Sequence, residues 1–139
     1  MKILFDKDNF MISSTIQKTP KNDWVLFDAI KNKVLGKNYE LSLTFIGKER
    51  MRTLNRTHRE KDYTTDVLSF PLDDLGPKSE IGEVFINIDK ADKKSKDFDR
   101  TPKNYLVFLF IHSLFHLKGL DHGDKMEKEE MKVRKIFGI

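Results

Sequence analysis

The chain has 139 residues, of which 38% are hydrophobic and 11% aromatic, so it can bury one core, and its 35% of charged residues does not indicate disorder. The formal net charge of +4 permits a polyanionic partner without requiring one. The sequence contains no cysteine, which excludes a disulfide framework, a thiol nucleophile and a cysteine-held metal cluster. We expect residues 1–139 to form a single domain in which any metal binds to histidine, aspartate or glutamate.

The spacing of apolar and turn residues predicts elements in the order β-α-β-α-β-β-α-α-α. The expected strands are 3–10, 41–45, 67–70 and 83–88. The expected helices are one that starts within 20–23 and ends before Gly36, 48–57, a short one within 90–103, one that begins at 102, and 125–137. This order predicts an α+β fold with a four-stranded mixed sheet packed against helices.

The helix that begins at Pro102 is expected to be central. Thr101 is a suitable N-cap, and proline is favoured at the first helical position. The following residues, 106–111, are all apolar, so the helix has hydrophobic side chains on nearly every side and belongs in the interior. The apolar stretch from Tyr105 to Leu117 is too short to span a bilayer, and the N-terminus has no signal peptide, so we expect a cytoplasmic protein without a membrane partner.

Three of the four histidines fall within one segment at the end of this helix. His112 and His116 are four residues apart, which places them on the same helical face. His122 would point about 120° away on a continuous helix, but Gly119 can end the helix and turn the chain back. Three imidazoles leave one position of a tetrahedral metal open, as in catalytic zinc sites. The spacing therefore predicts a metal site formed by His112, His116 and His122.

The pattern H-x-x-x-H-x-x-G-x-x-H has the ligand spacing of one class of zinc proteases. Those enzymes have a glutamate directly after the first histidine as general base, and here that position is Ser113. A serine hydroxyl cannot accept a proton from water near neutral pH, so this protease mechanism lacks its base. Asp121, next to the last histidine, is a candidate to orient an imidazole from outside the ligand set.

Four of the six arginines lie between Arg50 and Arg59. Arg52, Arg56 and Arg59 follow a helical spacing and are expected to form one stripe. Arginine side chains bind phosphate oxygens well, so the stripe is a candidate surface for a nucleic-acid backbone. A charged stripe alone is also typical of a solvated helix face.

Four segments carry a resemblance to a known family: the run TDVLSFP from Thr65 to Pro71, the preceding segment from Leu54, Gly82-Glu83 and the histidine segment. Together they resemble the YbeY family of bacterial metal-dependent endoribonucleases, which mature ribosomal RNA. The resemblance covers most of the chain after Leu41. It implies a zinc ion on the three histidines, a functional role for Arg59, and single-stranded ribosomal RNA as substrate, including the 3′ end of the small-subunit RNA. It also implies one α+β domain with the histidine helix at its centre.

The chain departs from the usual family pattern at four positions. Ser113 replaces a typical glycine, Leu120 and His58 replace typical tyrosines, and Thr64 replaces a typical proline. None of these changes removes a predicted metal ligand. The resulting expectation is a zinc-dependent endoribonuclease that binds RNA, the ribosome or its small subunit, without a dinucleotide cofactor. The alternatives are a zinc-stabilised, non-catalytic ribosome-assembly factor that binds RNA, and a metalloprotease, which Ser113 disfavours.

Overall fold

The computed structural model describes residues 1–59 and 65–139, and the side chains of Arg59 and Pro77 are also outside this description. The elements are β1 (Lys2–Lys7), β2 (Phe10–Ser14), α1 (Trp24–Val34), β3 (Glu40–Ile46), α2 (Lys48–Arg59), β4 (Val67–Pro71), η1 (Gly76–Lys78), β5 (Ile81–Asn87), α3 (Ile88–Ser95), η2 (Lys96–Phe98), α4 (Pro102–Leu117) and α5 (Asp124–Phe137). Here η denotes a short 3-10 helix. The fold is α+β, as the sequence indicates.

One mixed sheet runs through the molecule in the strand order β1-β2-β3-β5-β4. β2, β3 and β5 are parallel to one another, while β1 and β4 lie antiparallel at the two edges. The sheet has five strands and not the expected four, because the predicted strand 3–10 covers only β1 and the turn of a hairpin whose second strand, β2, was not predicted. Asp8 adopts a left-handed conformation with φ of +49°, which reverses the chain before Phe10 begins β2.

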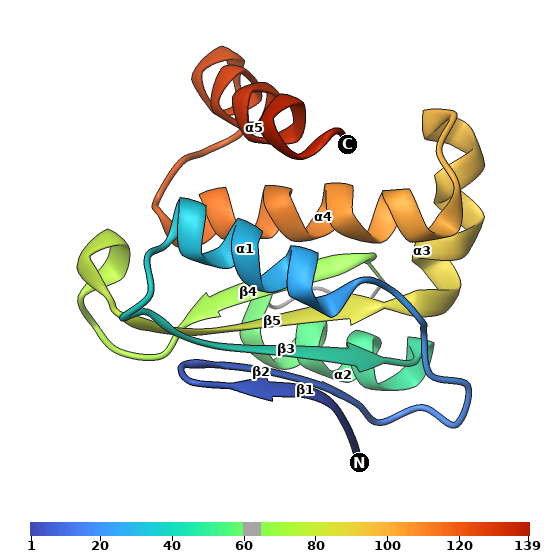
Figure 1. Ribbon diagram of the computed structural model, residues 1–139. Coiled ribbons are helices and arrows are strands. Elements are labelled where there is room, and N and C mark those ends of the chain that lie inside the picture. The colour runs from blue at the N-terminus through green and yellow to red at the C-terminus, as the bar shows by residue number, and fades with distance from the viewer. Residues whose placement is uncertain (60–64) are drawn as a thin grey trace.

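Helices cover both faces of the sheet (Figure 1). α1 and α4 lie over one face and α2 lies over the other, where Met51 packs with Ile46, Leu68 and Phe85. α5 lies on the outer side of α4, so α4 is enclosed between the sheet and another helix. No described helix is long and apolar enough to cross a membrane.

The central position of α4 follows from its sequence. Thr101 accepts a hydrogen bond from the backbone N–H of Asn104, and Pro102 follows as the first helical residue, as expected. Phe110 is fully buried and packs against Phe27 and Phe10, with ring centroids 4.8 Å and 5.7 Å away. Burial of large aromatic rings supplies much of the stabilisation of a small core. This core fixes the helix that carries the first two histidines.

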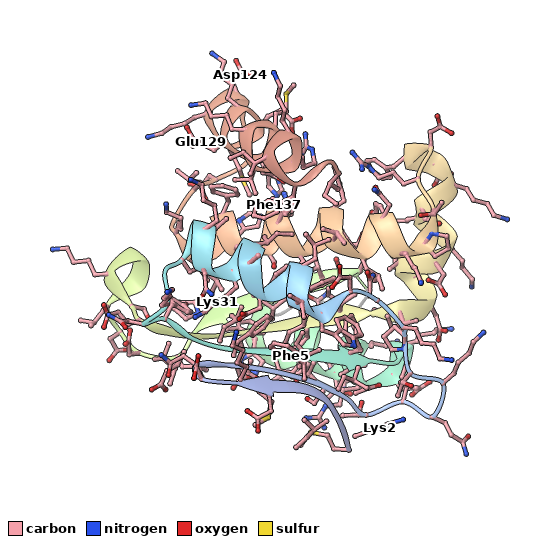
Figure 2. All side chains as sticks on the ribbon, viewed as in Figure 1. Lys2, Phe5, Lys31, Asp124, Glu129 and Phe137 are labelled. Atoms are coloured by element: carbon pink, nitrogen blue, oxygen red, sulfur yellow. The ribbon has the colours of Figure 1, made fainter. Side chains whose placement is uncertain are left out.

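α5 closes the chain with an amphipathic pattern. Figure 2 shows Asp124 and Glu129 on its outer side and Phe137 on the side toward α4. Phe137 packs against the main core, and Met126 and Val133 are buried. One buried position on this inner face is the charged residue Glu130, and it contacts the histidine cluster.

Candidate metal centre

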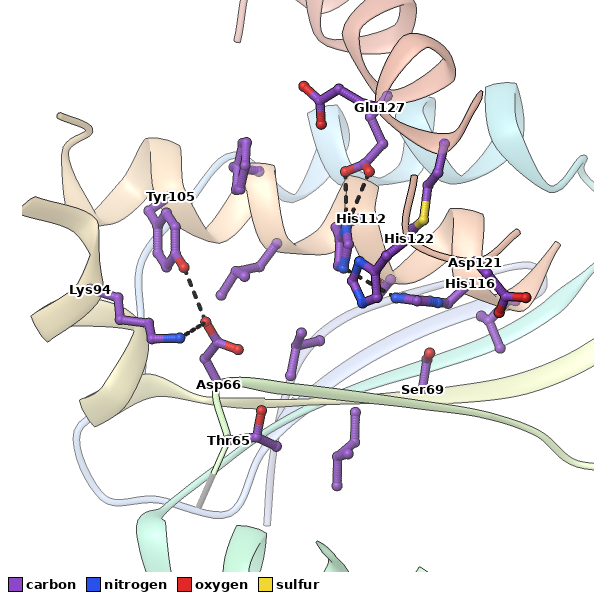
Figure 3. Close-up of a pocket in the computed structure, with 18 of the residues that line it drawn as sticks. Thr65, Asp66, Ser69, Lys94, Tyr105, His112, His116, Asp121, His122 and Glu127 are labelled. Carbon is purple, nitrogen blue, oxygen red and sulfur yellow. Dashed lines mark hydrogen bonds and ion pairs between the residues drawn. The ribbon is translucent and has the colours of Figure 1, made fainter. Parts of the chain in front are cut away.

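Two of the three histidines lie one helical turn apart on α4. The ring centroids of His112 and His116 are 4.6 Å apart. α4 ends at Leu117, and Gly119 has a left-handed backbone with φ of +89°, which glycine reaches at no steric cost. The chain turns back, and the His122 ring lies 5.0 Å from that of His112 and 4.8 Å from that of His116. The structure thus brings together the three imidazoles that the spacing indicates (Figure 3).

The spacing of the ring nitrogens suits a shared metal ion. Each of the three rings offers one nitrogen atom that lies within 4.8 Å of the other two. The Nε2 atoms of His112 and His116 are 3.1 Å apart. Two nitrogen ligands at about 2.0–2.1 Å from a tetrahedral zinc lie roughly 3.3 Å from each other. The donor set therefore fits a divalent metal such as zinc with only small movements of the rings.

A buried carboxylate fixes the orientation of one imidazole. Both carboxylate oxygens of Glu130 lie 3.1 Å from Nδ1 of His112, and the Glu130 side chain is 4% exposed. Because a carboxylate only accepts hydrogen bonds, the Nδ1–H of His112 is the donor. In the neutral ring, Nε2 then carries the lone pair and faces the cluster, which is the tautomer that a metal at Nε2 requires.

The sequence-based predictions miss Glu130. It comes four residues after Met126 and three before Val133, so it belongs to the apolar face of α5. A glutamate on such a face is unusual because burial of an unpaired carboxylate is costly. That position is the signal that could have identified it. The guanidinium of Arg134 lies 3.8 Å from Glu130 and adds a second partner for the buried charge.

The protonation of His116 also suits metal binding. Burial lowers the pKa of His116 below the ordinary imidazole value, and the neighbouring rings of His112 and His122 lower it further. Glu130 and a backbone hydrogen bond with Leu120 act in the opposite direction but do not reverse the shift. His116 is therefore neutral at pH 7, so its lone pair is available to a metal without loss of a proton.

The histidines open into a cleft of about 900 Å³ between β4 and the helices α4 and α5. The edge strand β4 contributes all of its residues to one wall. At the opposite end of the cleft from the histidines, Figure 3 shows Asp66 between Tyr105 and Lys94. A cleft of this size along an edge strand can accept an extended chain rather than a small molecule alone.

Asp66, immediately before β4, contacts both α4 and α3. The hydroxyl of Tyr105 donates a hydrogen bond of 3.0 Å to Oδ2 of Asp66, and the Lys94 ammonium lies 3.6 Å from the same oxygen. Burial and the neighbouring carboxylate raise the pKa of Tyr105 well above its usual range, so the phenol stays protonated and remains a donor. These contacts hold one wall of the cleft against the other. No local pattern in the sequence indicates them.

Ser113 and Asp121 flank the cluster in different ways. The Ser113 side chain is buried, and its hydroxyl donates a 2.6 Å hydrogen bond to the Phe110 carbonyl of its own helix. Asp121 is exposed and lines the cleft. Over residues 1–59 and 65–139, no hydrogen bond joins Asp121 to an imidazole, and the carboxylate that contacts a ring nitrogen is that of Glu130. An orienting role for Asp121 stays a prediction.

The three arginines of the predicted stripe lie on α2. Arg52 and Arg56 are exposed, and neither belongs to the described lining of the cleft. Arg59 is the last residue of α2, but its side chain lies outside the described part of the structure, as do residues 60–64 that follow it. His58 contacts the ring of Phe70 on β4 at 4.8 Å, so the end of α2 packs near the strand that lines the cleft. RNA binding by these arginines stays a prediction.

Comparison with known proteins gives a consistent result. A family model described as Endoribonuclease YbeY matches residues 5–136. An Endoribonuclease YbeY of Alkaliphilus metalliredigens is 43% identical over 103 residues, which are 70% of this chain and 66% of that protein. Another, of Finegoldia magna, is 40% identical over 109 residues, 73% of this chain and 71% of that protein.

A solution structure of a protein from Thermotoga maritima has a similar fold, with a TM-score of 0.61 and 22% sequence identity. The similarity covers 93% of this chain and 89% of the other. At this identity the likeness concerns the fold alone. The family match spans nearly the whole chain, including the histidine segment and the strand that lines the cleft. The chain therefore belongs to the YbeY endoribonuclease family.

Proposed function

We propose that this protein is a cytoplasmic, zinc-dependent endoribonuclease that cleaves single-stranded regions of ribosomal RNA during ribosome maturation, including the 3′ end of the small-subunit RNA. The observation that carries the proposal is the cluster of three imidazoles at the wall of a cleft about 900 Å³ in volume. Family membership supports RNA as the substrate class.

His112, His116 and His122 would hold the metal. When bound by three neutral ligands, a divalent ion polarises a phosphoryl oxygen and lowers the pKa of water toward neutrality. Glu130 keeps the Nδ1 proton of His112 on the outer side of the ring, so that Nε2 stays a ligand atom. A set of imidazoles without thiolate or an oxygen-rich cage suits zinc, and also nickel or copper, rather than magnesium or calcium. Among these metals, the family resemblance favours zinc.

The chain's own cations would bind the substrate. Arg59 follows the family pattern and would stabilise the negative charge that develops on the phosphate during cleavage. Arg52 and Arg56 would contact the RNA backbone further along α2. Lys94 lines the cleft near Asp66 and would attract the phosphates that pass over β4.

The two alternatives predict different chemistry. A metalloprotease of the matching ligand pattern needs a carboxylate base at position 113, where a serine hydroxyl bonds to its own helix. A structural zinc ion in an assembly factor would typically have four protein ligands, whereas the cluster found within residues 1–59 and 65–139 has three, which would leave the fourth position of a tetrahedral metal open.

The direct test is cleavage of a labelled RNA that contains both single-stranded and duplex regions. We expect cuts in the single-stranded regions by the purified protein, loss of cleavage with a chelator, and recovery when zinc is added back. Cleavage that persists after complete removal of the metal would contradict zinc dependence. Hydrolysis of a peptide library in place of RNA would favour the protease, and zinc-dependent RNA binding without any cleavage would favour the assembly factor.

A further inference from the structure

An exposed aromatic ring lines the cleft away from the histidines. Phe98 ends η2, and the residue is 49% exposed although it belongs to the same cleft lining as the histidine cluster. The proposed reaction gives this ring no role. A phenylalanine that stays half exposed forgoes much of the stabilisation that full burial would provide.

The Phe98 ring is supported from within the molecule. Its centroid lies 5.3 Å from that of Tyr105 and 5.6 Å from that of Phe108, and these two rings stack on each other. Tyr105 is itself held by its hydrogen bond to Asp66. The ring therefore has a supported side and a solvent-facing side, and its position is set before any ligand arrives. Preorganised aromatic surfaces lose little conformational entropy on binding.

Two cationic side chains lie near this aromatic group. Lys94 lines the same cleft, and the guanidinium carbon of Arg100 lies 4.6 Å from the Phe108 ring centroid. Residues 90–103 contain six basic and three acidic side chains, so this segment contributes most of the net charge of +4. An aromatic face beside cations is the arrangement that binds single-stranded nucleic acid, since the ring stacks on a base and the cations contact phosphates.

The rings that support Phe98 lie on α4, the helix that also carries His112 and His116. Tyr105, which supports Phe98, precedes His112 by seven residues, or roughly 10 Å of helical rise. A nucleic-acid strand rises about 3.4 Å per stacked nucleotide. An extended strand advances further per nucleotide, so a strand with its reacting phosphate at the histidine cluster would place a base within about three nucleotides of that phosphate near Phe98.

We propose that Phe98 is a stacking platform for one unpaired nucleobase of the RNA strand whose reacting phosphate lies at the histidine cluster. The inference rests on the proposed function and adds a specificity-determining residue to it. A base within a duplex is paired and stacked on its neighbours, so it cannot lie flat on the Phe98 ring. The platform therefore contributes to selection of single strands.

The test measures binding of a short 2′-O-methyl oligonucleotide, which lacks the free 2′-hydroxyl, to the metal-loaded protein. Phe98→Leu retains an apolar side chain without an aromatic face, and Phe98→Tyr retains the face. We expect Phe98→Leu to weaken binding at least about fivefold, because loss of one base–aromatic stack has effects of this size or larger. Phe98→Tyr should bind like the parent protein. Ile136→Ala is the matched control, because Ile136 is also an exposed apolar residue, 59% exposed on α5, and does not line the cleft.

A double-mutant cycle separates stacking from a general structural effect. A series of oligonucleotides carries one abasic residue at successive positions. In the parent protein, loss of the base at one position should lower the binding affinity more than loss of the base at neighbouring positions. In Phe98→Leu that position should lose its extra sensitivity, while the other positions respond as in the parent.

The remaining outcomes would contradict the platform, the proposed endoribonuclease function, or both. An unchanged affinity and abasic profile in Phe98→Leu would overturn the platform, as would an equal loss at every position. If the parent shows the expected profile but does not cut unmodified RNA, the platform stands and the proposed endoribonuclease function fails. If the parent binds no single-stranded oligonucleotide, both fail.

Discussion

The histidine cluster combines three basic groups that would repel one another if protonated. Burial and the two neighbouring imidazoles lower the pKa of His116, so the ring remains neutral to a lower pH than an ordinary imidazole. Glu130 supplies the compensating negative charge on the outer side of His112. A cluster with neutral inner nitrogens and a carboxylate behind them is suited to a cation, because the proton and the metal compete for the same lone pairs.

Replacement of Glu130 with alanine should weaken zinc affinity about tenfold or more, because outer partners of ligand histidines have effects of this size. The affinity would be measured by competition with a chromophoric chelator. Glu129→Ala is the matched control, because it removes the same charge from the same helix, while Glu129 pairs with Lys132 and not with a histidine. Equal zinc affinity in the two variants would show that the contact with His112 does not position the ligand.

Replacement of Arg59 with alanine should reduce the rate of RNA cleavage at saturating RNA by about a hundredfold, the size expected for loss of a group that stabilises transition-state charge. Arg59→Lys should be impaired less, because lysine keeps the charge but not the bidentate geometry. Zinc content should be unchanged in both. Arg50→Ala, an exposed residue of α2 outside the arginine stripe, is the control. Recovery of the full rate at saturating RNA would limit Arg59 to a role in binding.

Among the elements, the turn after α4 decides whether the third histidine reaches the other two. The amide of Gly119 donates to the His116 carbonyl and that of Leu120 to the Phe115 carbonyl, which closes the helix end. The direction of the chain after this turn depends on the left-handed conformation of a single glycine.

Gly119→Ala should lower the free energy of unfolding by about 1–2 kcal/mol, the cost of a left-handed conformation for a residue with a Cβ atom. It should also weaken zinc binding, because relaxation of this strain moves His122. Gly36→Ala provides the control: Gly36 has φ of +94°, lies after α1, and is remote from the histidines in the chain. Denaturant titration and zinc titration of both variants would check this. Similar stability losses with a loss of zinc affinity only in the Gly119 variant are expected, and unaltered zinc affinity in that variant would contradict the role of the turn.

The elements that could be predicted are those whose signals are local. The N-cap and proline of α4, its apolar run and the spacing of its histidines all lie within one segment of sequence. The hairpin of β1 and β2 was not predicted, since its turn is only Asp8-Asn9 within an otherwise continuous strand pattern. Glu130 and the contacts of Asp66 depend on how α5 and β4 pack against α4, which no local pattern encodes.

At the scale of the whole molecule, the edge of the sheet and α4 together line one cleft for an extended substrate. The sheet ends at β4, and the central helix carries Tyr105 and His112 along the same cleft. The chain has a net charge of only +4, so its overall electrostatic attraction for a polyanion is modest. RNA binding should therefore depend on a few positioned cations together with stacking, rather than on general attraction.

Lys94 tests whether individual positioned cations contribute to RNA binding. The affinity for single-stranded RNA should fall as salt rises, and Lys94→Gln should reduce the slope of log affinity against log salt by about 0.7, the value for one phosphate contact on a single strand. Lys33→Gln, an exposed lysine on α1, is the control and should leave the slope as in the parent. An unchanged slope in Lys94→Gln would mean that its ammonium serves only Asp66.

The central claim is that three histidines hold the metal on which RNA cleavage depends. The most direct measurement is the zinc content per chain and the RNA cleavage rate, determined on the same preparations of the parent protein and of His116→Ala. We predict close to one zinc ion per chain and metal-dependent cleavage in the parent, with both lost in His116→Ala at neutral pH while the helical content is retained. A His116→Ala protein that keeps a full complement of zinc and the parent's cleavage rate would contradict the account.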